Sequence, residues 1–242
     1  MKKIAVMQPY LFPYLGYFQL AHAVDDFVFL DDVTFIKGGY INRNNILLNG
    51  EPHRFALPVH DISSFRTIHE HRYIGPVTKF FDLLRHAYRK APQFDAVYPL
   101  VQEVLGNAED PVSQVNARSV RMTLDYLGVR RSFGFSSAID PLPGQGGEER
   151  VVRLCEHRRA AVYINASGGR ALYDAGRFRD QGLSLGFIEP RFTEYRQKAE
   201  RFVPGLSVID ALMWNAPQDV AAMLANYSVD FPAPNGGIQH AH

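Results

Sequence analysis

Polar residues follow three predicted strands of this sequence, at the points where the strands end. Gln8-Pro9-Tyr10 follows the first strand, Asp31-Asp32 follows the second, and the segment 165–169 follows a later one. The carboxyl ends of parallel strands meet at one edge of a sheet, where open α/β folds bind their ligands. If these strands share a parallel sheet, their polar residues converge, which predicts one crevice for a small-molecule substrate.

The loop after the first strand is unusually aromatic and opens a predicted helix. Its segment Tyr14-Leu15-Gly16-Tyr17 has the position and spacing of His-x-Gly-His in the nucleotidyltransferase superfamily. In those enzymes the glycine lets a base lie against the backbone, and the histidines donate hydrogen bonds to the triphosphate. Tyrosine replaces both histidines here, and a phenol is uncharged near pH 7. We expect Tyr10, Tyr14 and Tyr17 to contact a ligand beside Gly16. The alternative is an aromatic loop packed under a lid.

The acidic pair that ends the second predicted strand could act in catalysis. Asp31 or Asp32 could bind Mg²⁺, orient an amine or accept a proton. The alternative is a turn in which one acid caps a helix or pairs with Arg43.

A loop with two cations and several amides follows the acidic pair. Lys37 and Arg43 are predicted to neutralise a phosphate or a carboxylate, because arginine binds either group through two parallel hydrogen bonds. Asn42 and Asn44 flank Arg43 and are predicted to bind the same substrate. The alternative is a solvated loop whose asparagines adopt left-handed turns.

A glycine pair after a later strand forms the third part of the predicted site. The N–H groups between this strand and the next helix could cradle an anion, although a plain tight turn explains the glycines equally well. Tyr173 lies one turn into that helix and could face the same cleft. The predicted substrate-binding residues in this segment are Asn165, Ser167, Gly168, Gly169 and Tyr173.

The other residues with metal-binding or nucleophilic side chains form no recognisable set. The histidines lack the spacing of a zinc site, so we predict no metal-ligating residues among them. Cys155 lies on a predicted amphipathic helix, which favours a buried small hydrophobe over a nucleophile. We find no P-loop, no dinucleotide-binding glycine pattern and no Gly-x-Ser-x-Gly elbow.

Composition narrows the class of protein. The chain has 242 residues, is 46% hydrophobic and carries a formal net charge of +1. The near-neutral charge argues against a dedicated duplex nucleic-acid binder, so we expect no nucleic-acid partner. Cys155 is the single cysteine, which fits a reducing, cytoplasmic location. No apolar run reaches the roughly 18 residues that a membrane span needs.

Apolar periodicity predicts the elements that must position these residues. The pattern indicates an α/β fold with a parallel-rich, Rossmann-like sheet, in which a nucleotidyltransferase-like βαβ unit comes first. Asn49-Gly50 is typical of a type I′ hairpin turn. We expect one domain over residues 1–230 with a helical insertion over about 76–127, and a flexible tail over 231–242. Further predicted segments are strands at 3–7, 27–30, 46–51, 55–59, 132–137, 160–165 and 183–188, a loop at 35–46, and helices at 16–25, 148–159, 170–180 and near 206–225.

Three segments together resemble the WbqC-like family. They are 7–20, beginning Met-Gln-Pro-Tyr, 31–44, beginning Asp-Asp-Val-Thr-Phe, and 163–173, beginning Tyr-Ile-Asn. Ala166 stands where proline is common in that family, and Tyr40 stands where tryptophan is expected. The resemblance implies a bacterial protein associated with O-antigen and other surface-glycan gene clusters. The motif positions that it marks are Gln8, Tyr10, Tyr17, Asp31, Lys37, Asn42, Arg43, Asn165, Gly168, Gly169 and Tyr173.

The leading hypothesis is an enzyme that forms an amide between a small acyl or amino-acid group, such as glycine, and an amino sugar. Its partners would be a nucleotide-linked amino sugar and an acyl donor, activated either as an adenylate made from ATP and Mg²⁺ or as a thioester. One alternative is a non-catalytic nucleotide-sugar-binding accessory protein. Another is an ATP-dependent nucleotidyltransferase or ligase. The sequence leaves the donor, the acceptor, the cofactor and the oligomeric state open.

Overall fold

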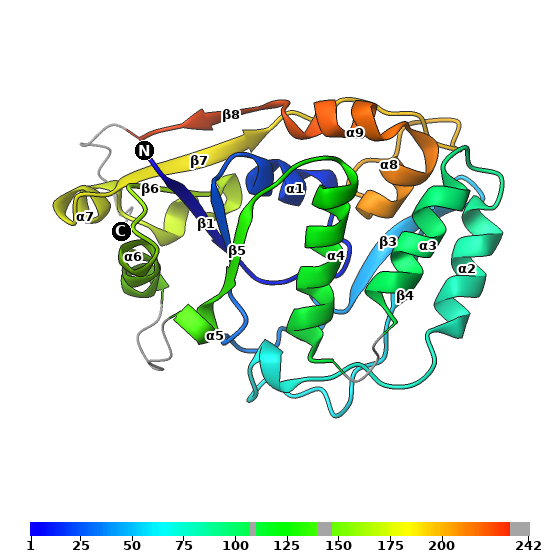
Figure 1. Ribbon diagram of the computed structural model, residues 1–242, viewed down its shortest axis with the longest axis horizontal. Coiled ribbons are helices and arrows are strands. Elements are labelled where there is room, and N and C mark those ends of the chain that lie inside the picture. The colour runs from blue at the N-terminus through cyan, green and yellow to red at the C-terminus, as the bar shows by residue number, and fades with distance from the viewer. Residues whose placement is uncertain (107–109, 140–146, 233–242) are drawn as a thin grey trace, which may run out of the picture.

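A mostly parallel sheet forms the centre of the molecule. The computed structural model describes residues 1–106, 110–139 and 147–232. Within these residues the central sheet has six strands in the order β5-β2-β1-β6-β7-β8, and a separate hairpin pairs β3 with β4 (Figure 1). All neighbouring strands of the central sheet are parallel except β7 and β8. The predicted α/β, Rossmann-like fold is confirmed.

The strands are β1 (Lys3–Met7), β2 (Asp26–Phe29), β3 (Arg43–Leu48), β4 (Glu51–Ala56), β5 (Ser132–Phe135), β6 (Val162–Ala166), β7 (Ser184–Pro190) and β8 (Tyr227–Asp230). The α-helices are α1 (Leu15–His22), α2 (Thr78–Tyr88), α3 (Phe94–Val104), α4 (Val112–Tyr126), α5 (Ser136–Ile139), α6 (Gly147–His157), α7 (Ala175–Asp180), α8 (Val208–Trp214) and α9 (Pro217–Leu224). Two 3₁₀ turns are η1 (Ile68–Glu70) and η2 (Ser167–Leu172).

The order of the strands reverses once within the central sheet. The chain passes from β1 outward to β2 and β5, and then returns to place β6 on the other side of β1. Ile4 of β1 therefore lies between Asp26 of β2 and Tyr163 of β6. The point where the strand order reverses, between β1 and β6, is where open α/β sheets bind ligands.

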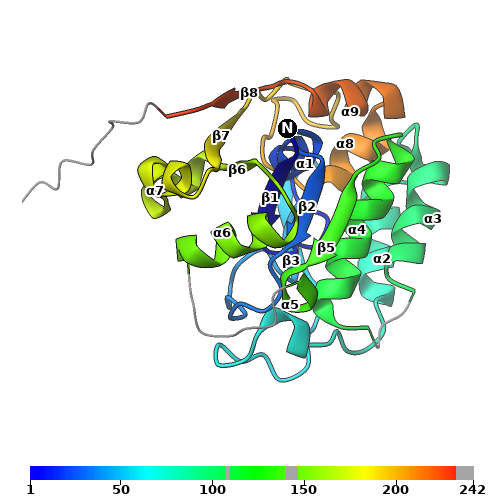
Figure 2. The ribbon, with the colours of Figure 1, turned by 60° about the vertical axis from the view of Figure 1, so that its left-hand side comes forward.

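Alternating apolar side chains bury both faces of the sheet. Phe27 and Phe29 point into the larger cluster with α1, α4, α8 and α9, whereas Val28 joins the smaller cluster under α6 and α7. Figure 2 shows α6 and α7 on one side of the sheet and α1 and α4 on the other. Each fully buried large apolar side chain contributes about 1.5–3 kcal/mol, which makes this two-sided burial the main support of the rim.

The turn of the hairpin and the helices that follow it agree with the sequence pattern. The strand predicted at 55–59 is wrong in its extent, because β4 begins directly after the turn, at Glu51. Asn49 and Gly50 have φ of 52° and 86°, as a type I′ turn requires. Along the chain, the helices α2, α3 and α4 come after the hairpin and before β5, within the predicted helical stretch. The first hairpin strand begins at Arg43, so Arg43 and Asn44 belong to β3 and not to the predicted loop.

Two predicted helices are wrong in their extent, for local reasons. The segment predicted as one helix at 170–180 is η2 followed by α7, because the Asp174 carboxylate accepts the Gly176 N–H at 2.7 Å and starts a new helix. The helix predicted near 206–225 is α8 and α9, separated before Pro217. The sequence pattern missed β8, a four-residue strand that pairs antiparallel with β7.

Two further expectations concern the ends and the surroundings of the chain. The predicted tail at 231–242 lies outside the described residues from 233 onward. Across the described part of the chain, every helix is too short or too polar to cross a membrane.

A buried carboxylate joins three parts of the fold behind the sheet. Asp210 of α8 is fully buried and accepts a 2.9 Å hydrogen bond from the Tyr88 hydroxyl of α2. That hydroxyl also accepts the Leu47 N–H of β3 at 3.1 Å, and Tyr195 faces the same carboxylate. Burial raises the pKa of Asp210 to about 6, although the neighbouring donors oppose the shift.

This raised pKa predicts a pH-dependent stability. The unfolded Asp210 side chain titrates near pH 4, so between about pH 4 and 6 the folded state holds a proton that the unfolded state has lost. Stability should therefore fall by about 3 kcal/mol as pH rises through this window. In urea unfolding at several pH values, Asp210→Asn should remove this slope, since the amide cannot ionise. Parallel stability curves for the two proteins would contradict the assignment.

Candidate functional site

The rim that carries the predicted site is the carboxyl edge of the parallel strands. Gln8 follows β1, Asp31 lies just beyond β2, Ser136 follows β5 and Ser167 follows β6. These strands are neighbours in the sheet, so the three polar clusters that the sequence marked lie at one edge. The structure therefore brings together segments that are far apart in the chain.

The β1–α1 loop, residues 8–14, has a strained conformation in its middle. Phe12 has a φ of 41°, a region that costs a non-glycine residue about 1–3 kcal/mol. The Phe12 N–H donates to Ser119 Oγ of α4 at 3.1 Å. The Phe12 carbonyl accepts from Asn44 Nδ2 at 2.8 Å and from Ser207 Oγ at 2.7 Å. These bonds from three elements offset the strain.

A second buried amide ties the β1–α1 loop to the loop at 36–42. Asn116 Nδ2 donates to the carbonyls of Pro9 at 3.0 Å and Ile41 at 2.7 Å. Asn116 Oδ1 accepts the Tyr73 hydroxyl at 2.7 Å. Asn116 was not predicted from the sequence. Its polar side chain on the otherwise apolar face of α4 could have indicated a buried hydrogen-bonding role.

The tyrosines of the site form two layers. Tyr17 is 3% exposed, and its hydroxyl donates to the Gln8 carbonyl at 2.9 Å, so it supports the site from beneath. Tyr10 packs on Tyr17 and on Tyr40, with ring centroids 5.7 and 6.1 Å apart. The hydroxyl of Tyr10 also donates to Gln8 Oε1 at 3.3 Å. The outer layer therefore holds Tyr10 and the more exposed Tyr40, a residue that sequence analysis did not place in the site.

The glycine at the start of α1 is covered. The ring of Tyr14 lies on Gly16 so closely that a Cβ there would overlap Tyr14 Cε2. Tyr14 also contacts the Phe192 ring and remains 37% exposed. The backbone surface that a base would use in a His-x-Gly-His enzyme is thus occupied by an aromatic ring in this structure.

The phenols of Tyr10 and Tyr14 are neutral groups. Burial raises the pKa of Tyr10, and the nearby Tyr14 and Tyr40 phenols raise it further. Burial and Tyr40 raise the pKa of Tyr14 in the same way. These hydroxyls can donate and accept hydrogen bonds across the physiological pH range.

The acidic pair makes many contacts within the protein. Asp31 is 3% exposed and accepts the Ser137 N–H at 3.1 Å and the Ser137 hydroxyl at 2.9 Å, which caps α5. Burial raises the pKa of Asp31, and the Ser137 bonds oppose the shift. Asp32 Oδ1 accepts Ser136 Oγ at 2.6 Å, and its other oxygen pairs with Arg150 of α6. Asp31 thus caps a helix, as one of the alternative interpretations predicted. The other alternative, an ion pair between one of the acids and Arg43, is wrong.

These contacts bear on a metal site. A divalent cation would need the carboxylate oxygens of Asp31 and Asp32 as ligands. These oxygens already accept hydrogen bonds from Ser136 and Ser137 and pair with Arg150. Within residues 1–106, 110–139 and 147–232, no three His, Cys, Asp or Glu residues form a metal-binding group. The donor set at this rim does not fit Mg²⁺.

The basic loop places one guanidinium at the site. Arg43 Nε donates to the Gly39 carbonyl at 3.0 Å, and its terminal nitrogens lie against Gly38. Arg43 forms no ion pair with a carboxylate in the described part of the chain. Lys37 is exposed on the same loop. Asn42 and Asn44 have scaffold contacts instead, since their amides donate to the Leu57 and Phe12 carbonyls at 2.8 Å.

The segment after β6 is shaped by a close contact. Asn165 is buried, and its Oδ1 accepts the Ala166 N–H at 2.8 Å. Its Nδ2 lies so close to Gly169 that a Cβ there would overlap it, whereas nothing lies near a Cβ at Gly168. Tyr173 does not join the rim: it packs on Tyr163 and Phe178 under α7.

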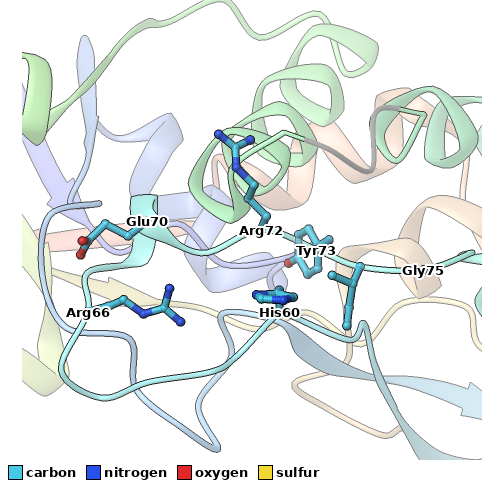
Figure 3. A pocket seen from close by; sticks show the side chains of 7 residues that line it. His60, Arg66, Glu70, Arg72, Tyr73 and Gly75 are labelled. Carbon is cyan, nitrogen blue, oxygen red and sulfur yellow. The ribbon is translucent and has the colours of Figure 1, made fainter.

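A cavity of about 800 Å³ lies beside the rim, in the segment after β4. Figure 3 shows Arg66 and Glu70 on one side of it and His60 and Tyr73 on the other. Its Tyr73 hydroxyl is the one bonded to Asn116, so the cavity wall and the β1–α1 loop share a support. Sequence analysis did not identify this cavity, because its lining comes from one irregular segment without a motif.

The two glycines give a matched test of the β6 segment. Gly169→Ala should cost about 1–3 kcal/mol in urea unfolding, because the buried Asn165 amide must move. Gly168→Ala should change stability by less than about 0.5 kcal/mol, because its Cβ meets open space. Equal effects of the two substitutions would refute the packing described for Asn165.

The chain can now be compared with known proteins. The model of the WbqC-like protein family matches residues 8–222. The chain is also similar to the uncharacterized protein Rv1507c of Mycobacterium tuberculosis (strain ATCC 25618 / H37Rv), with 26% identity over 217 residues, which cover 88% of this chain and 93% of that protein. No solved structure matches the present chain significantly. The family match spans the whole rim from Gln8 to the β6 segment, and the chain belongs to the WbqC-like protein family.

Proposed function

We propose that this protein is a transferase that joins a small acyl or amino-acid group, such as glycine, to the amine of a nucleotide-linked amino sugar. The biological setting, surface-polysaccharide synthesis, is the one that the WbqC-like resemblance implies. The observation that carries the proposal is the group formed by Gln8, Tyr10, Tyr14 and Tyr40 beside the switch point of the sheet.

This group has the chemistry of a sugar site. Aromatic rings stack on the apolar faces of sugar rings, and neutral phenols exchange hydrogen bonds with hydroxyl groups. Tyr10 and Tyr40 offer ring surface, and Gln8 adds an amide that can both donate and accept. Tyr17 supports Tyr10 from below, so the proposal gives it a positioning role.

Arg43 and Lys37 supply the positive charge that a nucleotide-linked sugar requires. The terminal nitrogens of Arg43 can bind a phosphate through two parallel hydrogen bonds. Its Nε is already fixed by Gly39, which orients the guanidinium before a ligand arrives. Lys37 adds a second cation to the same loop.

The contact between Tyr14 and Gly16 favours a donor that is activated before it binds. An adenylate made in place would need room for adenine against Gly16, and the Tyr14 ring lies there. With an acyl thioester, the sugar amine attacks the thioester carbonyl, the C–N bond forms and the C–S bond breaks. The thiol then leaves with the proton that the amine has lost.

One observation favours a second candidate function, a nucleotide-sugar-binding accessory protein. Both carboxylates of the acidic pair are engaged by Ser136, Ser137 and Arg150, so neither is a free catalytic base. A binding protein would use the same tyrosines and Arg43 and need no proton acceptor.

A matched arginine pair tests the proposal. The assay mixes the purified chain with a nucleotide-linked amino sugar and a glycyl or acetyl thioester, and follows the amide by mass spectrometry and the free thiol by colour. Arg43→Gln should lower kcat/KM about 10–100-fold, mainly through KM, because it removes a charge-assisted contact with the ligand. Arg54→Gln, on the exposed side of the same hairpin, should retain wild-type kinetics.

The outcomes separate the two candidates. Isothermal titration that shows binding of the nucleotide sugar without thiol release would support the accessory protein. Equal kinetics of the Arg43 and Arg54 variants would remove Arg43 from the binding site. Arg43→Lys controls for the lost Gly39 hydrogen bond, since it keeps the charge.

A further inference from the structure

We infer that His69 is the proton acceptor of this site and that it takes the proton of the sugar amine; the inference rests on the proposed transfer. His69 was not among the predicted site residues, and the sequence showed it only as a histidine without metal-ligand spacing.

The histidine is held against the end of β2. It lies in η1, which begins with a capping box: Thr67 N–H donates to Glu70 Oε2 at 2.6 Å, and the Thr67 hydroxyl donates to the same oxygen at 2.7 Å. The His69 N–H donates to the Asp31 carbonyl at 3.0 Å. The backbone of residue 69 is therefore held beside the acidic pair.

The hydrogen bonds define which ring nitrogen carries the proton. Nδ1 of His69 lies 3.2 Å from the Asp31 carbonyl and 3.2 Å from Thr67 Oγ1. A carbonyl oxygen can only accept, and the single proton of the Thr67 hydroxyl is already given to Glu70. Both neighbours of Nδ1 are acceptors, so the neutral ring carries its proton on Nδ1 and presents the lone pair of Nε2.

Nε2 is the available base at this part of the rim. The ring is partly buried, and no group in the described part of the chain hydrogen-bonds to Nε2. The neighbouring His71 differs, because its Nδ1 donates to the Thr67 carbonyl at 2.7 Å and its Nε2 accepts the Ser63 N–H at 3.1 Å. A neutral imidazole whose Nδ1 proton is fixed by a carbonyl is the usual form of a histidine base.

Two carboxylates and several paired cations surround the imidazole. The carboxylates of Asp31 and Glu70 both lie within electrostatic reach of His69. Among the cations nearby, Arg150 pairs with Asp32, and Arg66 pairs with Asp61. On α4, which packs against η1, Arg118 pairs with Asp110. The cations near the imidazole are therefore engaged by carboxylates.

The proton transfer completes the proposed reaction. The sugar amine attacks the thioester carbonyl, and its N–H proton passes to His69 Nε2 as the C–N bond forms. The C–S bond then breaks, and the thiolate takes the proton back from the imidazolium. Asp31 is a positioning residue in this scheme, because its carbonyl fixes Nδ1.

The first test needs no turnover. Nitrogen-15 NMR of the imidazole side chains should show His69 as the Nδ1–H tautomer, assigned with the variant His69→Asn. Titration with glucosamine should displace the Nε2 resonance, because the amine binds there, whereas N-acetylglucosamine, which has no free amine, should not. An Nε2–H tautomer, or no response to glucosamine at saturation, would overturn the inference.

The second test uses the transfer assay. His69→Asn can keep a donor near the Asp31 carbonyl but lacks Nε2, so kcat should fall about 10²–10⁴-fold while KM changes little. His53→Asn, at an exposed position of β4, is the matched control and should retain wild-type kcat.

The results distinguish this inference from the proposed function. If the wild type transfers the acyl group and His69→Asn keeps the wild-type rate, His69 is not the base but the function stands. If the wild type transfers nothing and glucosamine still shifts Nε2, the function falls while His69 remains the amine-binding group.

Discussion

Four buried polar side chains hold the β1–α1 loop in place, and the candidate site depends on them. Asn116 and Ser119 come from α4, Asn44 from β3 and Ser207 from the start of α8. Together they bond the backbone of Pro9 and Phe12, the latter with a positive φ. A buried polar group that loses its partner costs about 1–3 kcal/mol, so these bonds favour one loop conformation strongly.

This arrangement explains why residues of the same types lie both beneath the rim and on its outer layer. Asn44 and Tyr17 are buried and bonded to backbone carbonyls, whereas Tyr10 and Tyr40 are positioned above them. The same division applies to the acidic side of the rim. Asp31 is committed to α5, and His69, bonded to the Asp31 carbonyl, keeps a ring nitrogen available.

Periodicity was sufficient to predict the strands of the parallel sheet and the type of fold. Runs such as 27–30 are continuously apolar. This pattern is typical of a strand whose two faces are both covered. The errors came where a single capping or proline residue divides a helix, at Asp174 and Pro217. The strand β8 was missed because four residues carry little periodicity, and its pairing with β7 is a tertiary contact.

The sequence by itself determined that polar clusters follow β1, β2 and β6, and it predicted a shared edge only on the condition that these strands belong to one sheet. Only the tertiary structure decided which members face the rim. It turned Tyr173 under α7, joined Asp32 to Arg150, and brought Tyr40 and His69 to the rim. The physical reason is that a motif records residue types and spacing along the chain. The direction of a side chain depends on partners such as Asn116, which lies more than 70 residues from the carbonyls that it binds.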